Sequence, residues 1–411
     1  MAERRAVITG LGVVAPSGIG AETHWQTVCA GESRIGPITL FDADRYETGL
    51  AGEVPGFDIS KYVERRLEVQ TDRWTWLAFA AADFALSDAA LDPAAIDPFK
   101  LSVALASSSG GNQFGQRELQ RLWAPTTSRT VGAYQSIAWF YAATVGQLAI
   151  RYQAKGPSSV LVSEGAGGLD SLAHAARLVR RGADVVLAGG TEAPLSPYAL
   201  ACQQRGGRLS VAEDPGEAYL PFDRRAGGYV PAEGGAVFVV EDLEHALARG
   251  ARVRAEISGW AATHDGAPSV TRGAAPSVHY ARALRTALKR AGVEPEEVDV
   301  VFPDAVGVPA YDLAESQALR EVFGADGPAA VTTHKALTGR LYQGGSALDA
   351  ATALQAMEYG MLPRSAGPSE PAEGCELAFV RAERSAEVSS ALVGARGFDG
   401  FNSALLLSAA A

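Results

Sequence analysis

The stretch VLVSEGAGGLD at residues 160–170 joins a predicted strand to a predicted helix and decides the fold. Residues 160–162 are β-branched or apolar and follow a Gly156-Pro157 breaker, so we expect a buried strand. Small residues then give a tight turn, and apolar residues recur at helical spacing over 169–179. Many enzymes place a nucleophile at such a corner, because the start of the helix stabilises an anion. Here the corner carries glycine and alanine instead of a reactive side chain.

Strands and helices alternate on both sides of this corner, and the second half of the chain repeats the order of the first. Strands are predicted over 5–9, 102–106, 184–190, 236–240, 254–260, 298–302, 329–333, 390–395 and 404–407, and helices over 22–30, 71–86, 114–123, 277–291, 313–323 and 346–359. The repetition predicts two similar α/β halves whose sheets are covered on both faces. We place their boundary near Gly250, which gives domains of residues 1–250 and 251–411.

Composition narrows the class of protein. The 411 residues carry a net charge of −11, which argues against a nucleic-acid or anionic-membrane surface. No apolar run is long enough to span a membrane, and the first residues lead into a strand rather than a signal peptide. The three cysteines, Cys29, Cys202 and Cys375, have neither metal-site nor disulfide spacing. We therefore expect a cytoplasmic protein without a metal site.

Two weaker motifs point elsewhere and are set aside. Residues 10–15 imitate the dinucleotide fingerprint GxGxxA, but Pro16 follows, so the helix that must hold the pyrophosphate cannot begin at the second glycine. Ser163 half matches the nucleophile elbow GxSxG of hydrolases, yet Leu161 stands where that motif needs glycine.

His334 is expected in a loop or at the surface, and Cys202 as a small buried thiol that forms no acyl-enzyme.

Several motifs together resemble the β-ketoacyl synthases of the thiolase superfamily, and more narrowly the chain length factors of bacterial type II polyketide synthases. They are the segments 7–16, 166–170, 221–223, 228–235, 307–309 and 335–342, and the resemblance covers nearly the whole chain. It implies a thiolase-like α/β fold, in which two duplicated βαβαβ-type halves form a layered α-β-α-β-α arrangement. It implies no cofactor.

The resemblance also implies where catalysis would occur. Active ketosynthases carry the acyl chain on a cysteine at the corner, and two histidines stabilise the charge that forms when malonyl thioester loses carbon dioxide. In this chain these positions fall on Gly165, Asp304 and Arg340, whereas the family's Lys335 is retained. Because a buried charge needs a partner, we predict that Asp304 and Arg340 form a buried or half-buried ion pair. Many chain length factors carry glutamine at the position of Gly165, where it is linked to priming, so a priming role is not expected.

The implied function is therefore that of a non-catalytic subunit. Such a chain length factor pairs with a catalytic ketosynthase, meets the acyl carrier protein through that complex, and shapes the tunnel that holds the growing polyketide. The corner strand, residues 158–163, is expected to pair edge to edge with its counterpart. The candidate tunnel and interface residues are Phe114, Gln116, Ala133, Tyr134, Val162 and Ser163. For the aromatic side chains of Phe114 and Tyr134, packing in the core is the alternative to a place in the tunnel. The loop GFDGFN at 397–402 resembles the gate of active ketosynthases and is expected to be structural here.

One alternative remains open at this point. The chain could be an active acyltransferase or condensing enzyme of the thiolase superfamily that uses another nucleophile, for which Ser163 and Cys202 are the candidates. Glu164 is the charged group nearest the corner, and we expect it to be structural or to contact a partner.

Overall fold

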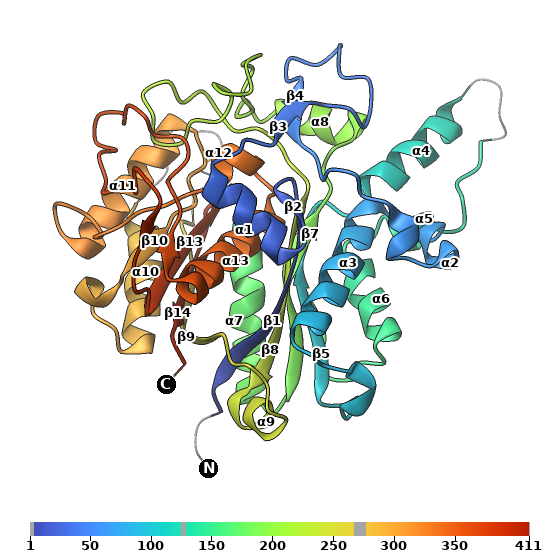
Figure 1. Ribbon diagram of the computed structural model, residues 1–411. Helices are drawn as coiled ribbons and strands as arrows, with labels where there is room; N and C mark the ends of the chain where they lie inside the picture. Colours follow the sequence, from blue (N-terminus) through green and yellow to red (C-terminus); the bar gives the residue numbers. More distant parts are fainter. Residues whose placement is uncertain (1–3, 125–128, 267–276, 411) are drawn as a thin grey trace.

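The chain is organised around one sheet. Figure 1 shows the protein as a computed structural model, which describes residues 4–124, 129–266 and 277–410. Residues 1–3 lie outside the described residues. They belong to the N-terminal segment in which we expected no signal peptide. The strands of the first half are β1 (Ala6–Ala15), β5 (Leu101–Ala106), β6 (Ser159–Leu161), β7 (Val185–Glu192) and β8 (Gly234–Asp242). Those of the second half are β9 (Ala255–His264), β10 (Val300–Phe302), β13 (Ser390–Gly397) and β14 (Phe401–Ser408).

The two halves have the same strand order and the same strand directions. From its edge, the first half runs β6-β5-β7-β8-β1, and β5 is parallel to both of its neighbours. The second half runs β10-β13-β14-β9, and a parallel bridge from Val331 to Val301 adds the strand position that matches β6. In each half the last two pairings are antiparallel. The predicted duplication is confirmed.

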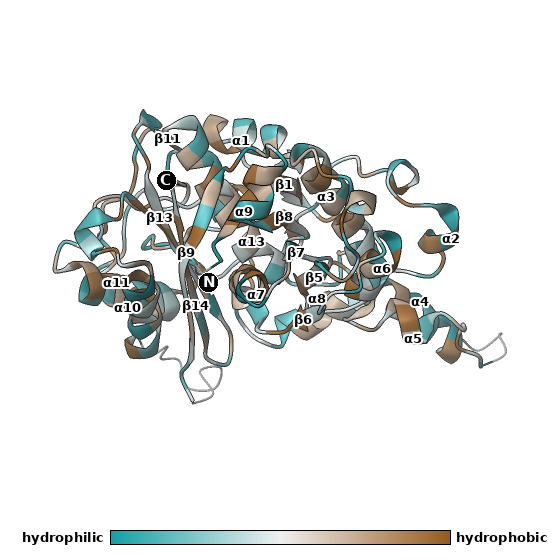
Figure 2. Cartoon of the chain, turned by 90° about the horizontal axis from the view of Figure 1, so that it is seen from below, coloured by the Kyte–Doolittle hydropathy of each residue, from teal (hydrophilic) through white to brown (hydrophobic). Residues whose placement is uncertain are grey.

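Helices cover both faces of each half. Between the halves lie α7 (Gly167–Arg180) and α13 (Gln343–Tyr359), which contact strands of both. On the outer face of the first half lie α3 (Arg73–Asp88) and α6 (Ala143–Arg151). On the outer face of the second half lies α10 (Val278–Ala291), with α11 (Pro309–Phe323) packed on it. The view from below in Figure 2 shows these layers, and the predicted α-β-α-β-α arrangement is confirmed.

The described residues contain other α-helices and strands as well. They are α1 (Ala21–Ala30), α2 (Arg65–Glu68), α4 (Asn112–Trp123), α5 (Gln135–Ala138), α8 (Pro197–Gln204), α9 (Leu243–Ala248), α12 (Lys335–Thr338), β2 (Gly18–Ile19), β3 (Ile35–Pro37), β4 (Leu50–Gly52), β11 (Met361–Leu362) and β12 (Arg384–Ser385). Among the described residues, no helix is both long and apolar enough to cross a membrane.

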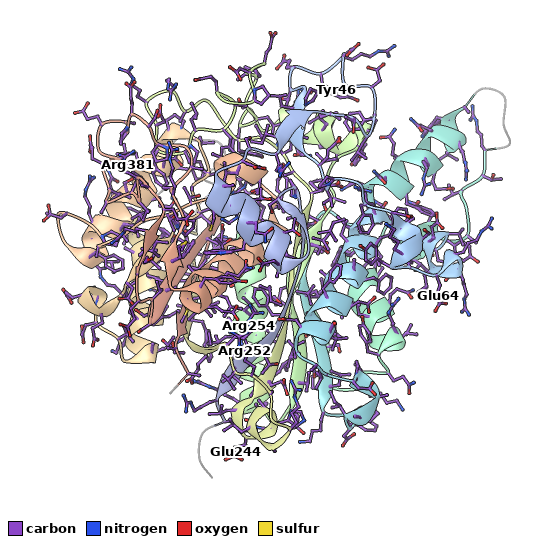
Figure 3. All side chains as sticks on the ribbon, in the orientation of Figure 1. Tyr46, Glu64, Glu244, Arg252, Arg254 and Arg381 are labelled. Atoms are coloured by element: carbon purple, nitrogen blue, oxygen red, sulfur yellow. The ribbon has the colours of Figure 1, made fainter. Side chains whose placement is uncertain are left out.

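The halves join into a single hydrogen-bonded sheet, which the sequence did not reveal. Strands β1 and β9 pair at Val7 with Glu256 and at Ile8 with Ala255. The connecting segment is held by ion pairs from Arg252 and Arg254 to Glu358 at the end of α13. Figure 3 labels both arginines at this junction. The connection between the halves is therefore fixed against the middle layer.

The glycines of the GxGxxA motif serve packing. A Cβ on Gly10 would lie 2.2 Å from the carbonyl oxygen of Ala85, and one on Gly12 would lie 1.9 Å from that of Ala81. Both carbonyls belong to α3, so its backbone rests directly on β1. Close-packed interiors tolerate no added methyl group at such contacts. Residues 10–15 all lie within β1, so the strand runs six residues beyond its predicted end at residue 9. The glycines of the motif allow α3 to pack closely on this strand.

The corner strand differs from its prediction. We expected a buried strand over 160–162, but β6 ends at Leu161, its three residues are half-buried, and Val162 is 51% exposed. The physical reason is that β6 is the end of the sheet and pairs only with β5. A short apolar run does not distinguish a strand buried within one chain from an edge strand that a second chain would cover.

Candidate functional site

The corner between β6 and α7 keeps the strained geometry of an active site. Glu164 has a φ of +49°, a left-handed conformation that costs a non-glycine residue free energy. Gly165 and Ala166 are buried in the single turn that leads into α7. Gly168 lies so close to α13 that a Cβ there would sit 2.4 Å from the backbone nitrogen of Ala347. The middle layer thus holds the turn rigidly.

Arg340 occupies the space in which the side chain of a nucleophile would stand. A Cβ on Gly165 would lie 2.4 Å from Nη2 of Arg340 and 2.7 Å from the carbonyl oxygen of Arg396. Arg340 is only 2% exposed. Any side chain at position 165 and the guanidinium of Arg340 therefore exclude one another.

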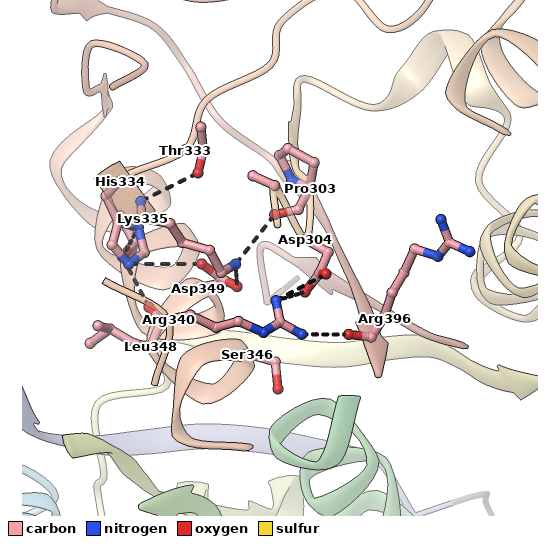
Figure 4. A network of polar contacts seen from close by, with 12 residues as sticks. Pro303, Asp304, Thr333, His334, Lys335, Arg340, Ser346, Leu348, Asp349 and Arg396 are labelled. Carbon is pink, nitrogen blue, oxygen red and sulfur yellow. Dashed lines mark hydrogen bonds and ion pairs between the residues drawn. The ribbon is translucent and has the colours of Figure 1, made fainter. Parts of the chain in front are cut away.

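The predicted ion pair is confirmed and is buried. Nη1 of Arg340 donates to Oδ1 and Oδ2 of Asp304 over 3.3 and 3.2 Å, and Nη2 donates to the carbonyl oxygen of Arg396 over 2.9 Å (Figure 4). Burial alone would lower the pKa of Arg340, but the carboxylates of Asp304 and Glu164 more than offset it and hold the pKa well above its ordinary value. The guanidinium also lies 5.2 Å from the ring centroid of Phe398.

Glu164 ties the corner to the loop at 397–402, a contact that the sequence did not predict. Its Oε2 accepts a hydrogen bond from the backbone N–H of Phe398 over 2.9 Å and lies 3.4 Å from Nη2 of Arg340. The ring of Phe398 stacks on Tyr229 with centroids 5.8 Å apart. One carboxylate therefore links the backbone of the loop at 397–402 to the guanidinium of Arg340.

The retained lysine belongs to a buried polar cluster behind this pair. Lys335 pairs with Asp349 and lies 3.5 Å from the carbonyl oxygen of Pro303. Burial raises the pKa of Asp349 to about 7, although Lys335 opposes the rise. His334 was expected in a loop or at the surface; it is 3% exposed, and its Nδ1 lies 3.2 Å from Oγ1 of Thr352. The surface assignment is wrong, because the turn before α12 faces α13 rather than solvent.

Two carboxylates of α11 hold the loop that carries Asp304. Glu315 accepts hydrogen bonds from the backbone N–H groups of Asp304 and Ala305 over 2.8 and 2.9 Å. Asp312 accepts those of Phe222 and Gly307 over 2.8 and 3.0 Å. Burial raises the pKa of Asp312 to about 8, and it raises the pKa of Glu315 too. The acids that surround Asp304 thus serve as backbone acceptors.

The alternative nucleophiles have no catalytic partner in the part of the chain that the structure describes. Ser163 is 7% exposed, and its hydroxyl donates a hydrogen bond to Oδ2 of Asp170 over 2.5 Å. Oδ1 of Asp170 accepts a hydrogen bond from the hydroxyl of Ser403. Cys202 was expected to be buried, but it is exposed on α8. That expectation is wrong because α8 presents this position to solvent. Neither group is hydrogen-bonded to a histidine.

The candidate tunnel and interface residues fall into two groups. Phe114 in α4 is 8% exposed, whereas Gln116 is half-buried and accepts the backbone N–H of Tyr198 over 2.8 Å. Ala133 and Tyr134 precede α5 and are exposed. Backbone hydrogen bonds link the region to β6, from Ser107 to Leu161 and from Gly111 to Trp139. The exposed apolar side chains along this line form what we term the apolar rim: Tyr134, Ile137, Trp139, Phe140, Tyr141 and Val162.

Comparisons with known proteins agree with this geometry. Residues 3–246 match the β-ketoacyl synthase N-terminal domain, and residues 254–368 match the C-terminal domain. The chain is 50% identical over 404 residues to the tetracenomycin polyketide synthase ketoacyl synthase beta subunit of Streptomyces glaucescens, covering 98% of this chain and 97% of that one. It is 32% identical to a 3-oxoacyl-[acyl-carrier-protein] synthase 2 of Coxiella burnetii, covering 99% of each.

Two solved structures extend the likeness to the whole fold. The ishigamide ketosynthase/chain length factor superposes with a TM-score of 0.92 at 28% identity over 100% of both chains. A type II polyketide synthase acyl carrier protein in complex with its ketosynthase, bound to the hexaketide, superposes with a TM-score of 0.89 at 26% identity over 99% of this chain and 100% of that one.

Proposed function

The chain belongs to the β-ketoacyl synthase family, and from this premise we propose that it is a non-catalytic chain length factor. In this role it pairs with a catalytic ketosynthase, and the two together build a polyketide whose length this chain helps to set. The acyl carrier protein reaches it through that complex. No chemistry by this chain alone is required.

One observation carries the proposal: Arg340 fills the place of the missing nucleophile. A ketosynthase needs a thiol at position 165 and neutral donors at 304 and 340 to stabilise an enolate. The chain has no side chain at 165, an anion at 304 and a cation at 340, and the last two are 3% and 2% exposed and paired. An anion at 304 would repel an enolate, and arginine does not exchange its proton near neutral pH.

The edge of the sheet supports pairing with another chain. Among the described residues, β6 ends the sheet, so one row of its backbone N–H and C=O groups has no strand of this chain beside it. The apolar rim continues from Val162 at the end of β6 to the residues around α5. Aromatic side chains grouped in this way are favoured at protein interfaces. A ketosynthase of the same fold offers the matching edge strand.

The residues proposed to shape the tunnel lie beside this edge. Phe114 is buried in α4, and Tyr134 lies at the start of α5 on the apolar rim. Packed interiors do not compress, so bulk at these positions shortens a cavity by excluded volume. The proposal assigns both side chains, with Gln116 and Ala133, to the tunnel that the two subunits enclose.

Co-purification tests the pairing directly. The chain and a family ketosynthase that carries the cysteine and both histidines are coexpressed, with an affinity tag on this chain alone. Val162→Glu puts a charge into the proposed interface and should reduce recovery of the ketosynthase at least tenfold. Val278→Glu is the matched control, because Val278 is 61% exposed on α10 in the other half. Equal recovery with both variants would contradict the proposed interface.

A further inference from the structure

The helix that carries Phe114 begins without a cap of its own. The first backbone N–H groups of a helix have no partner within it, and a side chain at the N-cap usually accepts one of them. The N-cap of α4 is Gly111, which has no side chain to do so. A Cβ there would lie 2.0 Å from the carbonyl oxygen of Ala138, so packing against α5 excludes a larger residue.

Asp72, the N-cap residue of α3, supplies the missing cap to α4 as well. Its Oδ2 accepts the backbone N–H of Phe114 over 2.6 Å, the short distance of a charge-assisted hydrogen bond. Its Oδ1 accepts the backbone N–H of Trp74 in the first turn of α3 over 3.4 Å. Asp72 is 1% exposed. One buried carboxylate therefore lies at the starts of two helices, where the positive ends of both helix dipoles stabilise it.

A second buried acid holds the loop before α4. Oε1 of Glu192, at the end of β7, accepts the backbone N–H groups of Ser108 and Ser109 over 2.6 and 3.3 Å. The neighbouring Thr191 donates to the carbonyl oxygen of Trp74 over 3.0 Å. The start of α3, the end of β7 and residues 107–114 are thus linked by polar contacts in the interior.

The side chain of Phe114 is fixed from its other side. Cζ of Arg117, one turn later in α4, lies 5.4 Å from the centroid of the Phe114 ring. Arg117 also acts electrostatically on Asp72. The backbone of Phe114 is held by the carboxylate and its ring by the guanidinium, and these two groups attract one another.

We propose that Asp72 is a positioning residue for polyketide length, because its carboxylate fixes the start of α4 on α3 and with it the place of Phe114 in the tunnel. This inference rests on the proposed function. Asp72 touches neither substrate nor partner in it. It acts through Phe114, so its loss changes where the tunnel ends and leaves the condensation chemistry of the ketosynthase intact.

The test uses the complete complex with Asp72→Asn. The amide keeps the shape of the side chain, but it removes the charge and turns one acceptor into a donor that faces an N–H group. Hydrogen exchange of the amides of residues 112–116 should become at least tenfold faster. Products longer than the normal one should rise several-fold as a share of all polyketide, while the total rate stays within about twofold.

The control is Asp83→Asn in the same helix. The carboxylate of Asp83 accepts hydrogen bonds from the guanidinium of Arg151 over 2.8 Å and from the hydroxyl of Tyr152 over 2.6 Å. Neither partner belongs to α4. It should change neither the exchange of residues 112–116 nor the products. If Asp72→Asn does not fold, Asp72→Glu keeps the charge and displaces it by one methylene, and the same two readouts apply.

Three results would overturn the inference. They are unchanged exchange at residues 112–116 in Asp72→Asn, faster exchange with an unchanged product distribution, or an unchanged distribution in Phe114→Ala. Failure of the proposed function looks different, because the wild-type chain would then form no complex with a ketosynthase. If the complex forms normally and Asp72→Asn changes neither the exchange of residues 112–116 nor the products, this inference fails and the proposed function stands.

Discussion

The corner at Gly165 and the apolar rim lie next to one another and have opposite character. The corner is closed and ionic: Arg340 and Asp304 are buried and paired, and no room is left beside Gly165. The rim is open and apolar, with Trp139 54% and Val162 51% exposed in the chain by itself. In an active ketosynthase the corner does the chemistry. In this chain the corner is buried and ionic, and the surface beside it is exposed and apolar.

Breaking the ion pair should have the largest effect of any change at the corner. Arg340→Ala leaves Asp304 buried without a counter-charge, which costs about 3–5 kcal/mol of unfolding free energy. Denaturant unfolding measures it. The double variant Arg340→Leu with Asp304→Asn removes both charges and should recover most of that loss. A loss below about 1 kcal/mol in Arg340→Ala would show that the corner is solvated rather than closed.

Restoring a thiol should harm the fold and restore no activity. In Gly165→Cys the new Cβ meets Nη2 of Arg340 at 2.4 Å, and such overpacking costs about 1–3 kcal/mol. Gly49→Ala is the control, because a Cβ at Gly49 meets no atom within 4 Å. If Gly165→Cys kept its full stability and mass spectrometry showed an acyl group on the introduced thiol, Arg340 would have to leave the site readily.

The buried carboxyl of Asp312 in α11, behind the corner, should also make stability depend on pH. Its folded pKa is raised to about 8 by burial, so the folded chain keeps a proton that the unfolded chain has already lost. Between the unfolded pKa of about 4 and the folded pKa of about 8, folded protein binds more protons than unfolded protein. Stability therefore falls as pH rises across this range and levels off above 8. Between pH 7 and 9 this amounts to about 1 kcal/mol. Thermal unfolding at pH 7 and pH 9 measures this loss of stability. Asp312→Asn should make stability less dependent on pH. If stability depended on pH as steeply in this variant as in the wild type, another group would be responsible.

A change in the apolar rim should alter the length of the polyketide and hardly alter the stability of the chain. Tyr134 is 40% exposed, so Tyr134→Ala should change the unfolding free energy by no more than about 0.5 kcal/mol. In the complex it should lengthen the polyketide, because it removes bulk from the tunnel. Analysis of the products by mass spectrometry decides the matter. Products of unchanged length at normal yield would remove Tyr134 from the tunnel.

The sequence was sufficient where local periodicity or the recognised family decides the structure. The turn after residue 162 and the helix that follows it could be predicted, and the opposite charges of Asp304 and Arg340 predicted their pairing once a family was recognised. The repeated order of strands and helices predicted two similar halves. These features depend on local periodicity or on the rule that buried charges need partners.

Contacts between distant segments that the family resemblance did not place at one site could not be predicted. The bond from Phe398 to Glu164 joins residues 234 positions apart, and nothing in either segment signals the other. The burial of His334 depends on α13, and the cap that Asp72 provides to α4 depends on where α3 lies. The half-buried state of β6 depends on a position at the end of the sheet, which an apolar run does not encode.

The most direct measurement is polyketide synthesis by the reconstituted pair, with the nucleophile removed from one subunit at a time. The chain alone should be inert, and its mixture with a ketosynthase should be active. Replacing the cysteine of the ketosynthase with alanine should abolish the activity, whereas Ser163→Ala and Cys202→Ala in this chain should keep it. Activity of this chain alone, or its loss in either of those two variants, would contradict the account.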